Sequence, residues 1–127
     1  MDVNAISKEV VDAALKVHQT LGPGLLESVY EKVLAKELSE RGLSVKCQEA
    51  VSITYEGEEI GVAFKADIIV NDLVILELKS VEELSKLHSK QLFTYLKLSN
   101  KSLGLLLNFG APLIKNGIVR VVNNLPE

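Results

Sequence analysis

Charged side chains interrupt two otherwise apolar stretches of this sequence, with types and spacing that suit metal-assisted chemistry. In the stretch LVILELKS, the two-residue period of a strand puts Glu77 and Lys79 on one face. In the stretch FKADIIV, Asp67 stands among strand-forming residues although aspartate forms strands poorly. Since an unpaired buried charge is costly, these residues need a partner, a metal or a function. An ion pair at a strand end is the ordinary alternative.

The loop between the two strands decides whether Asp67 and Glu77 can share a site. A two-residue loop at Asn71-Asp72 would pair Asp67 with Leu76 and put the two carboxylates on opposite faces of the sheet. A three-residue loop or one bulge shifts the pairing by one residue and sets Asp67 opposite Glu77. We therefore expect such an irregularity.

A third carboxylate is expected from the second predicted helix. Both Glu27 and Glu37 fall at or near its apolar stripe, so position on the helix does not separate them. Glu27 follows the helix-breaking run Gly22-Pro23-Gly24, which favours it as the residue that opens toward a cleft. Glutamate near a helix start also interacts favourably with the helix dipole, which is a sufficient structural reason for Glu27.

The third predicted helix carries Gln91 and Tyr95, which are four residues apart and therefore share a face. We expect this face to pack on the sheet, where both polar groups need hydrogen bonds. His88 lies one turn earlier. His88 and His18 are more readily explained as packed or rim histidines than as metal ligands. The apolar residues assigned to the same sector are Leu84, Leu87 and Leu98.

The spacing of apolar residues predicts the element order ααβββαββ. We expect Ser7 or Asn4 to cap the first helix and Gly42 to end the second. This order predicts an α/β (α+β) fold, with a mixed β-sheet flanked by helices. The predicted helices cover residues 6–21, 25–41 and 82–99. The predicted strands cover residues 43–55, 60–70, 73–78, 103–109 and 117–122.

Composition excludes several classes of protein. The chain has 127 residues, of which 47% are hydrophobic, so we expect one compact domain over residues 1–127. Fourteen basic and seventeen acidic residues give a net charge of −3, which provides no broad cationic field, so any contact with nucleic acid must be local. Cys47 is the only cysteine, which fits a reducing cytosol. No apolar run approaches the ~20 residues of a membrane span, so we expect a soluble, cytoplasmic protein with no membrane partner.

Taken together, these residues resemble the PD-(D/E)XK nuclease superfamily. The resemblance rests on Glu27, Asp67 and the run Glu77-Leu78-Lys79, followed by a helix with Gln91 and Tyr95. The run GLLESVY, which contains Glu27 and Tyr30, is similar to the signature of the GxxExxY proteins within that superfamily, and the likeness extends from about residue 10 to residue 123. Ala66 stands where the superfamily's name has proline.

The resemblance implies a restriction-endonuclease-like core and hydrolysis of DNA or RNA by a metal-activated water. The implied cofactor is Mg²⁺, or Mn²⁺, held by Asp67, Glu77, the Leu78 carbonyl and, directly or through water, Glu27. Lys79 would position or deprotonate the water and offset negative charge. Gln91 would orient Lys79 or a phosphate oxygen. The residues implied in support are Tyr95 and Tyr30, with His88 and His18 at the rim.

Two other interpretations remain open at this stage, so the sequence does not decide whether the site is catalytic. The chain could be an inactive module that binds nucleic acid or a protein partner, in which case a homo-oligomer could seal the site. It could also use Asp67, Glu77 and Lys79 as an internal salt-bridge network. A basic patch around the cleft would favour the enzyme, and its expected members are Lys65, Lys79, Lys86 and Lys90.

Overall fold

The structure is a computed structural model that describes residues 1–125. It confirms the expected order ααβββαββ and adds one short 3₁₀ helix, η1. The helices are α1 (Val3–Leu21), α2 (Glu27–Glu40) and α3 (Lys86–Ser99), with η1 at Ile114–Gly117. The strands are β1 (Val45–Tyr55), β2 (Glu58–Val70), β3 (Val74–Lys79), β4 (Leu103–Asn108) and β5 (Ile118–Val122).

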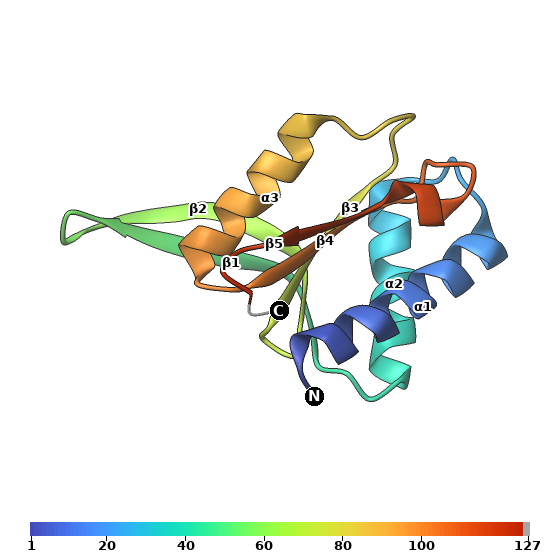
Figure 1. Cartoon of the computed structure of the whole chain (residues 1–127), viewed down its shortest axis with the longest axis horizontal. Coiled ribbons are helices and arrows are strands. Elements are labelled where there is room, and N and C mark those ends of the chain that lie inside the picture. Colours follow the sequence, from blue (N-terminus) through green and yellow to red (C-terminus); the bar gives the residue numbers. More distant parts are fainter. Residues whose placement is uncertain (126–127) are drawn as a thin grey trace.

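The five strands form one mixed sheet in the order β1-β2-β3-β4-β5 (Figure 1). The pair β3 and β4 is parallel because α3 crosses over between them, whereas the other neighbouring strands are antiparallel. The apolar character of β3 on both faces predicts a central strand, and β3 does lie between β2 and β4. The expected assignment of β1 to an edge is also confirmed.

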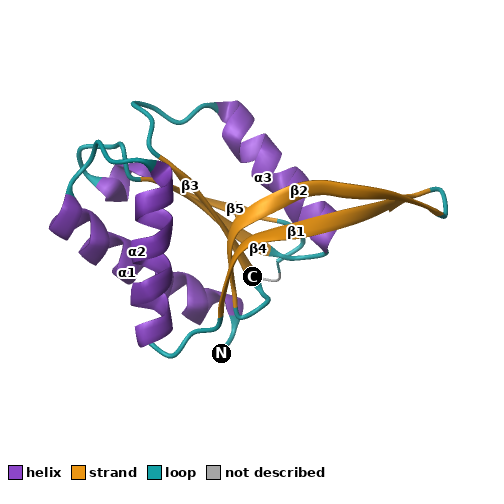
Figure 2. Ribbon diagram, turned by 180° about the vertical axis from the view of Figure 1, so that it is seen from behind, coloured by secondary structure: helices purple, strands orange, loops and turns teal. Residues whose placement is uncertain are grey.

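Helices cover both faces of the sheet. The helices α1 and α2 pack on one face and α3 on the other (Figures 1 and 2). Alternation along β3 divides its side chains between the two cores, with Leu76 and Leu78 facing α1 and α2, and Ile75 packed with Leu92 and Leu96 of α3. Glu77 and Lys79 follow Ile75 at two-residue spacing, so they belong to the α3 side of the strand.

The loop between β2 and β3 has the irregularity that the sequence analysis required. Val70 pairs with Val74, so three residues form the loop rather than two. Asn71 and Asp72 both have a positive φ, of 51° and 56°, which is a conformation that asparagine and aspartate tolerate better than most residues. The register that continues from this loop sets Asp67 opposite Glu77, as expected.

The hairpin of β1 and β2 projects beyond the body of the protein (Figures 1 and 2). A tight turn joins the strands, since Tyr55 pairs with Glu58 and the two residues between them, Glu56 and Gly57, both have a positive φ. The register then shifts twice toward the body, between Ile53 and Thr54 and between Val51 and Ser52. We call residues 51–62 the arm.

The first helix begins earlier than predicted. Asp2, and not Asn4 or Ser7, is its N-cap, because the Asp2 carboxylate accepts a hydrogen bond from the Ala5 N–H at 2.8 Å.

The helices of the described part of the chain were also compared with the requirements of a membrane span. None of them combines the length and apolar character needed to cross a membrane.

The other helix ends show one confirmed and two shifted boundaries. Gly42 ends α2 as predicted, with a φ of 85° that suits glycine. The start of α2 lies at Glu27, two residues later than predicted. The start of α3 lies at Lys86, four residues later than predicted, because Ser85 and His88 form a capping box that fixes the first turn there.

Candidate active site

The carboxylates of Asp67 and Glu77 are held against each other's strands where the ladder between β2 and β3 stops. The Asp67 N–H donates a hydrogen bond to Oε2 of Glu77 at 2.9 Å, and the Leu78 N–H donates to Oδ2 of Asp67 at 2.9 Å. Side-chain oxygens thus replace the carbonyl acceptors that a continued ladder would supply. These contacts bring two acidic groups, ten residues apart in the chain, to one place on the sheet.

The surroundings of the Glu77 side chain are unfavourable for a negative charge. It is 6% exposed, and burial together with the nearby Asp67 charge raises the pKa of Glu77 to about 8. The hydrogen bond from the Asp67 N–H and the charge of Lys79 lower this pKa, but they offset only part of the increase. A cation near both carboxylates would therefore be favourable, because it would replace a proton that the site otherwise retains.

The amine of Lys79 lies near this pair without being bound to it. Lys79 is half-buried at the end of β3, opposite Asn108 of β4. Within residues 1–125, no ion pair joins Lys79 to Asp67 or Glu77. The interpretation of these three residues as an internal salt-bridge network is therefore wrong, and the amine remains able to contact a substrate or a water molecule.

Glu27 lies at the start of α2 and reaches the end of β3. Its Oε2 accepts a hydrogen bond from the Ser80 N–H at 3.1 Å, and the Ser80 hydroxyl donates to the Leu25 carbonyl at 2.8 Å. Glu37, the alternative, forms ion pairs with Lys16 and Arg41, each at 2.9 Å. The structure thus separates the two glutamates, since Glu27 contacts the residue directly after the strand that carries Glu77, while Glu37 has a structural role.

Tyr30 fixes the loop that precedes Glu27. Its ring is fully buried and stacks on Phe109 at a centroid distance of 4.6 Å. Its hydroxyl donates to the Gly22 carbonyl at 2.5 Å and accepts from the Leu25 N–H at 3.1 Å. These bonds span the Gly-Pro-Gly run, so Tyr30 supports the position of Glu27 through the backbone.

Replacing Tyr30 with phenylalanine is expected to destabilise the protein by about 1–3 kcal/mol, because the Gly22 carbonyl and the Leu25 N–H lose their partner while the ring packing is retained. Urea unfolding measures this loss. Tyr55→Phe, at a hydroxyl that is exposed on the arm, is the control and is expected to leave stability unchanged. Equal stability of Tyr30→Phe and the wild-type protein would contradict this role for the hydroxyl.

Two residues beside Asp67 were not predicted from the sequence: Gln48, which bonds to Asp67, and Glu31, which bonds to Gln48. Both line a pocket of about 380 Å³ that also includes Glu27, Ser28 and Asp67. Nε2 of Gln48 donates to Oε1 of Glu31 at 2.6 Å and to Oδ1 of Asp67 at 3.3 Å. Burial raises the pKa of Glu31, and the Gln48 hydrogen bond opposes that increase. Glu31 could have been found, since it lies one helical turn after Glu27.

The donor set at this site suits a hard divalent cation in its chemistry. Asp67 and Glu77 provide carboxylate oxygens, which Mg²⁺ prefers, and Mg²⁺ commonly binds through one or two carboxylates and several waters. The expected convergence of three carboxylates is not seen, because no group of three or more His, Cys, Asp or Glu side chains among the described residues could hold one ion. Glu27 is instead bonded to Ser80, so two carboxylates fit the group and a third does not reach it.

The face of α3 that packs on the sheet differs from the one predicted. Leu92 and Leu96 are buried against the sheet, whereas Gln91 is exposed and Leu87 is 71% exposed. The predicted stripe was built on Leu84, which lies before the first residue of the helix, Lys86. Tyr95 lies at the border of the buried face, and its ring stacks on the ring of Phe64 with 3.9 Å between the ring centroids.

Tyr95 is nevertheless close enough to the carboxylates for their charges to affect it. Burial is the main cause that raises the pKa of Tyr95, and the charges of Glu77 and Asp67 raise it further. This places Tyr95 beside the site from the α3 side, which is consistent with the supporting role implied for it.

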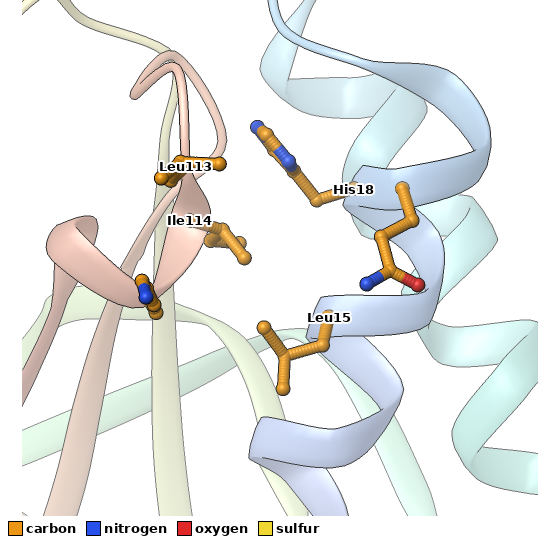
Figure 3. A pocket seen from close by; sticks show the side chains of 6 residues that line it. Leu15, His18, Leu113 and Ile114 are labelled. Atoms are coloured by element: carbon orange, nitrogen blue, oxygen red, sulfur yellow. The ribbon is translucent and has the colours of Figure 1, made fainter.

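Both histidines make structural contacts. Nδ1 of His88 accepts a hydrogen bond from the Ser85 N–H at 3.1 Å, which completes the cap of α3. Nε2 of His18 donates to the Ala111 carbonyl at 2.8 Å and so ties α1 to the loop after β4. His18 faces Leu113 and Ile114 across a separate pocket of about 240 Å³ (Figure 3). Neither contact involves the carboxylates of the candidate active site.

A mixed sheet with helices on both faces carries an aspartate on its second strand, and a glutamate and a lysine at the end of its third strand. The family model of the PD-(D/E)XK nuclease superfamily matches residues 4–121, and the chain belongs to this superfamily. The architecture is consistent with its restriction-endonuclease-like fold. Comparisons with curated proteins and with solved structures found no match.

Proposed function

We propose that this protein is a nuclease that depends on Mg²⁺ or Mn²⁺ and hydrolyses phosphodiester bonds of DNA or RNA. Membership of the superfamily suggests a nuclease-like function. The observation that carries the proposal is the placement of Asp67 against Glu77, whose pKa is raised to about 8, with Lys79, which forms no ion pair within residues 1–125, on the same strand as Glu77. A strongly perturbed pKa beside a charged partner is typical of functional sites.

Asp67 and Glu77 would hold the metal ion, with the Leu78 carbonyl as a further ligand and Glu27 acting through water. The bound ion would supply positive charge at the phosphate and favour ionisation of a water molecule. Lys79 would position that water and offset the negative charge that develops on the phosphate. Because Gln91 is exposed, we assign to it a contact with a phosphate oxygen rather than with Lys79.

Lysines without ion pairs support local contact with a polyanion. Of the expected basic patch, three members are exposed and Lys79 is half-buried, and in the part of the chain that the structure describes none of them forms an ion pair. The lysines that do form ion pairs lie elsewhere: Lys16, Lys36 and Lys46. Free amines can neutralise phosphates without first losing another partner.

The direct test is cleavage of fluorescent single-stranded DNA, duplex DNA and RNA by the full-length chain, with added Mg²⁺ or Mn²⁺ or with a chelator. We expect products only with metal, and we expect calorimetry to detect Mn²⁺ binding. If millimolar Mn²⁺ gives no binding heat, the proposed metal site is contradicted. If metal binds and no substrate is cleaved, catalysis is contradicted and the interpretation as an inactive module remains.

The alternative function is an inactive module that binds nucleic acid or a protein partner. It is favoured by the engagement of both arginines, because Arg41 is bonded to Glu37 and Asp12, and Arg120 to Asn4. Binding of an oligonucleotide without cleavage, or a dimer that covers Asp67, would support it. For either function we infer a reducing cytosol as the compartment, because the only cysteine, Cys47, is exposed and free.

A further inference from the structure

Gln48 has an unusual backbone conformation within the part of β1 that precedes the two register shifts and is otherwise regularly paired. Its φ is 51°, which residues with a Cβ rarely adopt. On either side the pairing is regular, since Cys47 faces Ile68 and Glu49 faces Ala66. The distortion is therefore confined to one residue, and that residue lies opposite Asp67. Such isolated strain persists only where the surrounding structure enforces it.

The side chain of Gln48 stands between two carboxylates. Its amide nitrogen donates to Oε1 of Glu31 at 2.6 Å and to Oδ1 of Asp67 at 3.3 Å. A primary amide has two hydrogens and an ionised carboxylate only accepts, so both hydrogens are used. The amide bridges two like charges without adding a charge of its own.

The two hydrogen bonds of the Gln48 amide differ in length. We take Glu31, the partner in the shorter bond, as the residue that anchors the amide, and Asp67, the partner in the longer bond, as the metal ligand that the amide orients. The shorter bond fixes the amide to Glu31 on α2, and the longer bond directs its second hydrogen at Oδ1 of Asp67. The other oxygen of Asp67, Oδ2, is fixed by the Leu78 N–H at 2.9 Å. The Asp67 carboxylate is thus oriented from both sides, and Oδ1 is kept at the wall of the pocket that Glu27 also lines.

We infer that Gln48 is a positioning residue that, anchored by Glu31, holds Oδ1 of Asp67 in place to bind the divalent cation. This inference rests on the proposed function, because it assigns a role to residues around the same site. Removing a residue that orients a metal ligand by a hydrogen bond commonly weakens the affinity of the site for the metal. The strained backbone of Gln48 is then explained, because an ordinary strand conformation would direct its side chain differently.

Two variants test the inference on the full-length, metal-free chain titrated with Mn²⁺ in a calorimeter. Gln48→Met keeps the length of the side chain and removes its donors, and Gln48→Gly removes the side chain and also relieves the backbone strain. Both are expected to weaken Mn²⁺ binding about tenfold or more. Denaturant unfolding without metal is expected to show Gln48→Gly at least as stable as the wild-type chain. Gln19→Met, at an exposed glutamine of α1, is the matched control and is expected to bind like the wild type.

A kinetic measurement separates positioning from a merely structural role. If Gln48 acts through metal affinity, the cleavage rate of Gln48→Met is expected to recover when the Mn²⁺ concentration is raised to saturation. Wild-type Mn²⁺ affinity in Gln48→Met would overturn the inference and leave the proposed function standing. A wild-type chain that binds no Mn²⁺ would overturn both. If Gln48→Gly loses as much free energy of unfolding as it loses free energy of Mn²⁺ binding, the role of Gln48 is structural and the inference is also overturned.

Discussion

Replacing Lys79 with alanine is expected to lower the rate of phosphodiester cleavage by about 10²–10⁴-fold, the range that a positioned proton-transfer or charge-stabilising group contributes. The amine has no ion-pair partner among residues 1–125, so its loss breaks no ion pair of the fold. Mn²⁺ should still bind, because Asp67 and Glu77 remain. Single-turnover cleavage at saturating Mn²⁺ measures the rate, and calorimetry measures the binding.

The control for this variant is Lys8→Ala, at an exposed lysine of α1, which is expected to cleave at the wild-type rate. The charge of Lys79 lowers the pKa of Glu77, so Lys79→Ala raises that pKa further. Mn²⁺ binding by Lys79→Ala should therefore be measured above the pKa of Glu77, where the proton no longer competes with the metal. Wild-type cleavage by Lys79→Ala would remove Lys79 from the proposed mechanism.

Replacing Glu77 with glutamine is expected to abolish Mn²⁺ binding and to stabilise the metal-free protein at alkaline pH. The pKa of Glu77 is raised from 4.5 to about 8, so the folded state keeps a proton that the unfolded state releases. The wild-type chain therefore loses stability as the pH rises from about 4.5 to about 8, and above that range the full penalty is present. Glutamine is neutral and can still accept from the Asp67 N–H, so the variant avoids this penalty, on the order of 5 kcal/mol.

Urea unfolding in the presence of a chelator, at about pH 5 and about pH 9, measures both chains across this range. Glu37→Gln is the matched control, because the ion pairs of Glu37 with Lys16 and Arg41 lower its pKa. Glu37 therefore stabilises the fold above its unfolded pKa, and that contribution is lost as the pH falls through its lowered folded pKa. The dependence of stability on pH thus has the opposite sign for Glu37 and for Glu77. A wild-type stability that does not decline between about pH 5 and about pH 9 would contradict the repulsion assigned to Glu77.

The parts of the site on β2 and β3 could be predicted because burial restricts them strongly. A two-residue side-chain period and two apolar cores leave few positions for Glu77 and Lys79. The requirement that Asp67 meet Glu77 then predicted a three-residue loop or a bulge, and the structure contains the three-residue loop. Glu27 was favoured over Glu37 for its place next to the Gly-Pro-Gly run, and Glu27 is the one bonded to Ser80, directly after β3.

The remaining parts depend on features that leave little trace in the sequence. The tight turn at the tip of the arm would by itself set Gln48 opposite Lys65, and only the two register shifts bring it opposite Asp67. The apolar spacing before α3 extended the predicted helix across the Ser85 cap and turned the predicted face toward Gln91. Neither a bulge nor a competing cap is visible in apolar periodicity.

Because of the two register shifts in the arm, the number of residues between the tip of the hairpin and the pocket determines which residue of β2 lies opposite Gln48. Deleting one residue of β2 between the tip and Asp67 would leave Gln48 facing the wrong neighbour or force the turn to rearrange. Residues added at the tip, beyond both shifts, would leave that match intact. Relatives of this chain should therefore tolerate longer or shorter tips, whereas changes between the bulges and the pocket should occur in compensating pairs on the two strands.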